Sequence, residues 1–213
     1  IFNLLFSSIC IVILVNGSNF CDGVNCNVIG YYLIVSLAIL YGEFPNPDNF
    51  PNIKIIIIIF FIFYLSNLFQ KSFLGDNGVY VINIFMAIYL INFINVNSYI
   101  SPLLALNLLW YPAFENLFTI VRRLNANKTI DKIDGLHLHT LLLKKIFNFN
   151  KNFIFSNSLT GILLNLFMFI GIFLSTNYYD DAKVLMLILI INITIYVLIY
   201  FLFLSRKIKF KSR

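Results

Sequence analysis

Positions 53–69 read IKIIIIIFFIFYLSNLF, and the residues from Ile55 to Leu65 are apolar without interruption. A helix needs about 20 mostly apolar residues to cross the hydrocarbon core of a bilayer, and this segment comes close to that length. The whole chain shares its character: of 213 residues 60% are hydrophobic and only 11% are charged, and the mean hydropathy is +0.88. A soluble domain carries about 25% charged residues. The composition therefore excludes a soluble globular domain, and it also excludes a disordered chain, which needs low hydrophobicity.

Similar apolar segments recur along the sequence. We expect seven of them to cross the bilayer, at about 1–15, 28–42, 53–69, 79–95, 99–114, 153–176 and 184–204. Backbone in contact with lipid must satisfy its hydrogen bonds internally, which favours helices. The sequence thus predicts an all-α polytopic transmembrane helix bundle that forms a single integral membrane domain over residues 1–213. Because Ile1 lies inside an apolar run with no Met before it, we expect the chain to be the C-terminal part of a longer protein.

The basic residues predict how the bundle is oriented. If the connections alternate sides, one face carries the segments 16–27, 70–78, 115–152 and the tail 205–213, and thirteen of the 15 Lys and Arg residues lie there. The other face has only Lys54 and Lys183. Such an excess marks the cytoplasmic side, so we expect a multi-pass protein of the plasma (inner) membrane. The basic tail is interpreted as a topology anchor that touches anionic lipid headgroups.

Three polar clusters fall on this face. They are Asn16-Gly-Ser-Asn-Phe-Cys-Asp-Gly-Val-Asn25, Phe73-Leu-Gly-Asp-Asn-Gly78, and Arg122-Arg123 followed by Asp134-Gly-Leu-His-Leu-His139. Carboxylates and amides suit a hard cation that keeps part of its water shell, such as Mg²⁺. Glycines let the backbone approach a phosphate, and Arg and His supply charge-assisted donors to phosphate oxygens. Together the clusters predict a surface that binds a diphosphate at the edge of the membrane.

Each cluster taken alone also has an ordinary interpretation. The Asp-Gly and Gly-Asp pairs are typical of loop turns. His137 and His139 share a face only if their segment is extended, so as an isolated pair they are solvated loop residues. Two histidines without a neighbouring cysteine make a zinc site an unfavourable interpretation.

In this order and spacing, the clusters resemble a known family. Asn16–Gly23 matches the pattern Asn-x-x-Asn-x-x-Asp-Gly, Phe73–Gly78 matches Phe-x-Gly-Asp-x-Gly, and the third cluster matches Arg-Arg with Asp-x-x-His-x-His. These are motifs of the polyprenyl-phosphate N-acetylhexosamine-1-phosphate transferases of glycosyltransferase family 4. The chain is more similar to the WecA-like branch than to the MraY-like branch, and the resemblance covers roughly residues 10–145.

The resemblance implies an enzyme that transfers a sugar 1-phosphate, N-acetylglucosamine 1-phosphate above all, from a UDP-sugar to undecaprenyl or another polyprenyl phosphate. UMP is released, and the reaction is the first membrane step of cell-surface polysaccharide synthesis. The expected cofactor is Mg²⁺, which Mn²⁺ could replace. The expected partners are the UDP-sugar, the polyprenyl phosphate and the lipid bilayer, and no nucleic acid is expected.

The motifs also imply roles for individual residues. Asp22 and Asp76 are expected to be catalytic, and Asn19 and Asp76 to be metal ligands. The ring of Phe73 is expected to stack on uracil. The phosphates or the sugar are expected to contact Asn16, Arg122, Arg123, His137 and His139.

The chain departs from the family pattern at three points. Asn25 stands where the family often has a second acidic residue, and Thr140 where many relatives have another histidine. The family's Asp-Asp motif precedes residue 1 in the family layout, and the pair Asp180-Asp181 does not replace it because that pair is expected on the outer face. We therefore expect the 213-residue chain to be inactive on its own.

Two other classes of protein remain as alternatives. A transport subunit would place ionisable residues deep within its spans, and most of the expected spans contain almost none away from their ends. A structural membrane subunit would need only the composition and the topology, but it leaves the three clusters unexplained.

Overall fold

The computed structural model describes residues 2–45, 52–126 and 135–205, and these residues form helices and their connections only. The helices are α1 (Phe2–Cys21), α2 (Asn27–Tyr41), α3 (Ile53–Leu68), α4 (Gly75–Val96), α5 (Leu103–Leu108), α6 (Trp110–Asn125), α7 (Leu138–Asn150), α8 (Phe153–Asn177) and α9 (Ala182–Ser205). The expectation of an all-α chain is therefore confirmed for this part of the protein.

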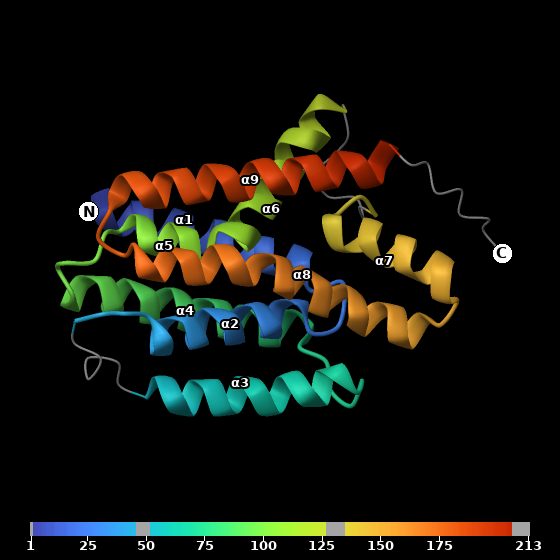
Figure 1. Cartoon of the computed structure of the whole chain (residues 1–213), viewed down its shortest axis with the longest axis horizontal. Coiled ribbons are helices and arrows are strands. Elements are labelled where there is room, and N and C mark those ends of the chain that lie inside the picture. Colours follow the sequence, from blue (N-terminus) through green and yellow to red (C-terminus); the bar gives the residue numbers. More distant parts are fainter. Residues whose placement is uncertain (1, 46–51, 127–134, 206–213) are drawn as a thin grey trace.

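The long helices lie side by side and alternate in direction (Figure 1). In the view of Figure 1 the connections α1–α2, α3–α4 and α7–α8 and the end of α9 all lie on the right. Helix α1 packs mainly against α6 and α4, and α2 packs between α3 and α8. The first polar cluster, at the α1–α2 connection, and the second, at the α3–α4 connection, therefore lie at the right-hand end of the bundle in this view.

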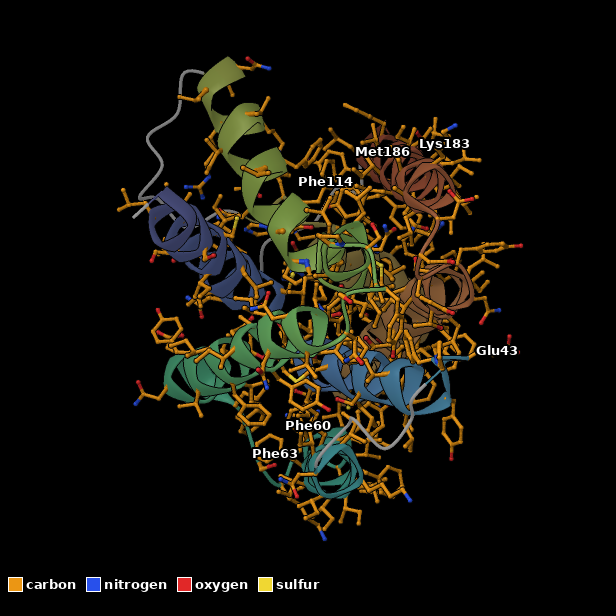
Figure 2. All side chains as sticks on the ribbon, turned by 90° about the vertical axis from the view of Figure 1, so that its left-hand side faces the viewer. Glu43, Phe60, Phe63, Phe114, Lys183 and Met186 are labelled. Carbon is orange, nitrogen blue, oxygen red and sulfur yellow. The ribbon has the colours of Figure 1, made fainter. Side chains whose placement is uncertain are left out.

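The outer surface of the bundle is apolar. Ile62 on α3, Ile170 on α8 and Leu202 on α9 are 63%, 68% and 62% exposed. Figure 2, which looks onto the opposite end of the bundle, shows such carbon-rich side chains projecting outward, with the charged Glu43 and Lys183 at that end. Monomeric soluble proteins rarely expose continuous apolar surface of this kind, so these faces indicate contact with lipid.

Three helices are long and apolar enough to cross a membrane, namely α4, α8 and residues 182–204 of α9. The segments Ser7–Cys21, Asn27–Tyr41 and Ile53–Leu68 are apolar but shorter. These helices indicate a membrane protein. The expected number of seven spans is not confirmed.

The expected span 99–114 is wrong as a single helix. Helix α5 ends at Leu108, the backbone breaks at Leu109 (φ −116°, ψ 10°), and α6 begins at Trp110. The reason is Pro112, which has no N–H to donate to the carbonyl of Leu108 in a continuous helix. In the first turn of α6 the missing N–H costs nothing, and the carbonyl of Leu108 accepts a hydrogen bond of 2.8 Å from the Tyr31 hydroxyl instead.

Two of the expected loops also contain helix. Residues 16–21 complete α1, so that Asn16 and Asn19 are helical. The expected loop 115–152 contains most of α6 and the whole of α7. The apolar segments of the sequence do not reveal α6, because polar and charged residues interrupt it. Its buried residues include Glu115, Asn116, Thr119 and Arg123. Its exposed residues include Leu117, Val121 and Leu124.

Close backbone contacts fix the end of α1 in the bundle. A Cβ atom on Gly17 would collide with the backbone carbonyl of Pro112 in α6, and Asn116 of α6 donates to the carbonyl of Ile13 at 3.1 Å. A Cβ atom on Gly161 of α8 would likewise collide with the carbonyl of Asn25. The α1–α2 connection is thus clamped between α6 and α8.

Candidate functional site

Two carboxylates lie within electrostatic range of each other at the clustered end of the bundle. Asp22 is half-buried directly after α1, and Asp76 is exposed in the first turn of α4. Burial, and secondly repulsion from Asp76, raise the pKa of Asp22 to about 7. Desolvation and a nearby like charge both disfavour the ionised form of a carboxyl group. The pair therefore forms a locus of unbalanced negative charge that a divalent cation would neutralise.

The donor set of this pair is compatible with Mg²⁺. Mg²⁺ keeps several waters and is commonly held by one or two carboxylates together with substrate phosphates. Within residues 2–45, 52–126 and 135–205 no three His, Cys, Asp or Glu side chains gather closely enough to hold a metal ion. A cation here would therefore take Asp22 and Asp76 as its acidic ligands, with Asn19 half-buried one turn before Asp22.

The two histidines are buried, so the interpretation as solvated loop residues is wrong. His137 is 7% exposed and His139 is 2% exposed. His137 precedes α7 with extended backbone (φ −71°, ψ 152°), which lets the two rings stack with their centroids 5.5 Å apart. The backbone at His137 is thus extended, as the sequence pattern requires for His137 and His139 to share a face.

The histidines pack against the carboxyl end of α1. The ring centroid of Phe20 lies 5.3 Å from that of His137, and a Cβ atom on Gly23 would collide with Nε2 of His139. Since Gly23 directly follows Asp22, the first and third clusters come into contact. The absence of a side chain at Gly23 is what allows His139 to lie there.

His139 is held as a neutral imidazole. Burial lowers its pKa to about 4, with a smaller lowering contribution from His137 and an opposing one from Glu115. In the described part of the chain no hydrogen-bond partner lies near its Nδ1 atom. A neutral imidazole can donate with one nitrogen and accept with the other, so Nδ1 of His139 is a buried polar atom whose hydrogen-bonding capacity the described residues leave unused.

Sequence reasoning missed Glu115 and Tyr196. The carboxyl group of Glu115, 1% exposed, contacts Nδ1 of His137 at 2.9 Å through Oε1. Its other oxygen, Oε2, accepts a hydrogen bond from the Tyr196 hydroxyl of α9. The available signal was a lone carboxylate within the apolar stretch WYPAFENLF, since ionisable residues beside lipid are functional candidates by default.

The remaining expected site residues lie on α1, before α4 and at the end of α6. Arg122 is half-buried and Arg123 is buried in the last turn of α6, about 10–12 Å along the helix axis from Glu115 at 1.5 Å per residue. Phe73 is 68% exposed before α4, and Asn16 is exposed on α1. Asp134 lies outside the described residues. The structure therefore brings the Asp22–Gly23 turn against His139 and within electrostatic range of Asp76, whereas both arginines lie about two turns of α6 beyond Glu115.

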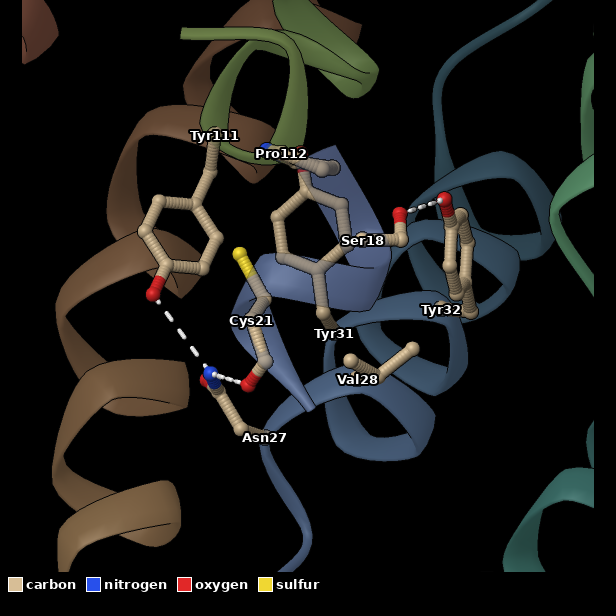
Figure 3. Close-up of a pocket in the computed structure, with 8 residues that line it drawn as sticks. All are labelled: Ser18, Cys21, Asn27, Val28, Tyr31, Tyr32, Tyr111 and Pro112. Carbon is tan, nitrogen blue, oxygen red and sulfur yellow. Dashed lines mark hydrogen bonds between the residues drawn. The ribbon is translucent and has the colours of Figure 1, made fainter. Parts of the chain in front are cut away.

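A small pocket lies at the first cluster, lined by Ser18, Cys21, Asn27, Val28, Tyr31, Tyr32, Tyr111 and Pro112 (Figure 3). Asn27 donates to the carbonyl of Cys21 at 2.7 Å and approaches the Tyr111 hydroxyl at 3.4 Å. Ser18 and Tyr32 lie 3.0 Å apart and both bond to Asn83 of α4. These bonds tie α1 to α2, α4 and α6, and so they support the site from inside.

No family model, no curated protein and no solved structure matches this chain.

Binding of Mn²⁺ to the purified chain is expected to weaken as the pH falls below about 7. Because the pKa of Asp22 is raised to about 7, its carboxyl holds a proton below that pH, and the cation must displace it. Each pH unit below this value is expected to cost about tenfold in affinity. Electron paramagnetic resonance of free Mn²⁺ measures the effect, and Asp22→Asn is expected to flatten the profile. A pH-independent affinity in the unmodified chain would contradict this prediction.

Proposed function

We propose that this chain belongs to the machinery that transfers a sugar 1-phosphate from a UDP-sugar to a polyprenyl phosphate, with Mg²⁺ bound at Asp22 and Asp76. The site would lie on the cytoplasmic face of the plasma membrane. The observation that carries the proposal is that Asp22 and Asp76, which come from two separate motifs, lie within electrostatic range of each other, and that Gly23, next to Asp22, packs against the buried His139.

The position of the site supports the choice of substrates. The clusters lie at the ends of helices that have apolar outer faces. A lipid phosphate in the membrane would reach them from the side, and a soluble nucleotide sugar would reach them from the aqueous phase. In the reaction an oxygen of the lipid phosphate bonds to the β-phosphorus of the UDP-sugar. The bond from that phosphorus to the bridging oxygen breaks, and UMP leaves with the electron pair.

The described side chains supply what such a transfer needs. Two anionic molecules must come together, and bound Mg²⁺ supplies charge neutralisation between their phosphates. Neutral His139 packs against Gly23, next to Asp22, and its buried Nδ1, which has no hydrogen-bond partner among the described residues, would pair with a phosphate or sugar oxygen that enters the site. Arg122 and Arg123, in the last turn of α6, would contribute positive charge that favours binding of the nucleotide.

Binding of UDP-N-acetylglucosamine to the full chain in lipid nanodiscs tests this proposal. We expect binding that requires Mg²⁺ or Mn²⁺ and that UMP displaces. A chain that does not bind the UDP-sugar in the presence of the cation, or that binds it equally well without the cation, would overturn the proposal.

Replacing Phe73 by Ala is expected to weaken UDP binding about 5- to 150-fold, the equivalent of about 1–3 kcal/mol for one aromatic ring stacked on a base. The ring is 68% exposed and therefore accessible to uracil. Phe69→Ala is the matched control, because Phe69 is also 68% exposed and lies at the end of α3 outside the motif. Equal affinities of the two variants would rule out the stacking role.

A further inference from the structure

The last helix contacts the candidate site although it carries none of the motif residues. Tyr196 of α9 is fully buried and donates its hydroxyl hydrogen to Oε2 of Glu115 on α6. Oε1 of the same carboxyl group contacts Nδ1 of His137 at 2.9 Å. Three residues from distant parts of the chain thus form one buried chain of hydrogen bonds that ends at the site.

The partner of Nδ1 determines the state of the imidazole. A carboxylate cannot donate, so Nδ1 of His137 carries the hydrogen, and Nε2 is the nitrogen left for other contacts. The stacked ring of His139 and the tilted ring of Phe20 pack against the same imidazole and restrict its plane. Both the ring plane and the position of the proton are therefore set by neighbours.

The hydroxyl of Tyr196 in turn fixes the carboxyl group. A buried carboxyl oxygen without a partner is costly, and Glu115 without Tyr196 would turn to share Oε2 with another donor. One donor in this region is the Thr119 hydroxyl, which lies 3.5 Å from Nδ1 of His137. The ring of Tyr196 packs edge-on against Trp110 and Phe114, so its own position does not depend on the hydrogen bond.

We propose that Glu115 and Tyr196 are positioning residues that hold His137 in the Nδ1–H tautomer with its ring plane fixed. The use of that tautomer for phosphate contact rests on the proposed function, whereas the tautomer itself does not. Helix α9 thereby controls a site residue on α7 from outside the three motifs.

Nitrogen-15 NMR of the imidazoles in lipid nanodiscs tests the proposal directly, because the chain has only 2 histidines and selective labelling gives two sets of signals. His139→Gln assigns them. In the unmodified chain we expect His137 to be protonated at Nδ1. In Tyr196→Phe, which keeps the aromatic packing, we expect the fraction protonated at Nε2 to rise about tenfold, as the loss of one buried hydrogen bond predicts. Glu115→Gln is expected to abolish the tautomer preference.

Tyr31→Phe is the matched control. It removes a buried hydroxyl that donates to the backbone carbonyl of Leu108 at 2.8 Å and that does not touch Glu115. Its His137 signals are expected to match those of the unmodified chain. An unchanged tautomer in Tyr196→Phe and Glu115→Gln, or an equal change in Tyr31→Phe, would overturn the proposal. Normal tautomer coupling in a chain that binds no UDP-sugar would instead overturn the proposed function alone.

Discussion

Asp76→Asn is expected to lower the affinity of the chain for Mn²⁺ by on the order of 100-fold and to abolish cation-dependent binding of UDP-N-acetylglucosamine. The substitution removes one of the two negative charges that would hold the cation. Replacing a residue that only supports a metal ligand lowers metal affinity by about 10- to 100-fold. Replacing a charged ligand itself is therefore expected to lower the affinity by at least the upper value of that range. Paramagnetic resonance of free Mn²⁺ and nucleotide binding in nanodiscs measure the two effects.

The control for this variant is Asp180→Asn, which removes an exposed carboxylate at the opposite end of the bundle. It changes the net charge of the chain equally and is expected to leave both affinities unchanged. Because Asp76 is exposed in the first turn of α4, its replacement is not expected to disturb folding. Near-normal Mn²⁺ affinity in Asp76→Asn would place the cation site elsewhere.

Gly17→Ala is expected to destabilise the chain by about 3 kcal/mol, the upper part of the usual range for overpacking a close contact. The added methyl group would collide with the backbone carbonyl of Pro112, which cannot rotate away as a flexible side chain would. The end of α1 must then separate from α6, and Phe20, Asp22 and Gly23 would move away from the histidines. Thermal unfolding in detergent measures the loss of stability, and UDP binding measures the damage to the site.

Gly135→Ala provides the matched comparison, since the nearest atom to its added Cβ is Nζ of Lys144 at 3.5 Å, an ordinary contact distance. We expect its melting temperature to stay within a few degrees of the unmodified chain, because about 1 kcal/mol corresponds to roughly 2–4 °C for a chain of this size. A Gly17→Ala chain as stable as Gly135→Ala would show that α1 and α6 do not pack as closely as described.

Particular elements show where sequence reasoning succeeded and where it could not. Residues 53–69 and 153–176 were expected as helices and are found as α3 (Ile53–Leu68) and α8 (Phe153–Asn177), because a long apolar run next to lipid has no other way to satisfy its backbone. Residues 115–125 were expected as loop and are helical. Their polar residues face the protein and their apolar residues face outward, which is the reverse of the soluble pattern on which periodicity arguments depend.

The sequence alone determined the all-helical class, the membrane character and the grouping of the motifs at one end. The class follows from hydropathy, which is a local property of the sequence. The grouping follows because consecutive helices run antiparallel, so that every second connection lies at the same end of the bundle. Only the tertiary structure decided which of these residues touch. Glu115 meets His137 across 22 residues and Tyr196 across 81, and Asp22 approaches Asp76 from another helix. Such contacts depend on how closely the helices pack, for example on the bare Cα of Gly17 against Pro112, and no local pattern in the sequence encodes that distance.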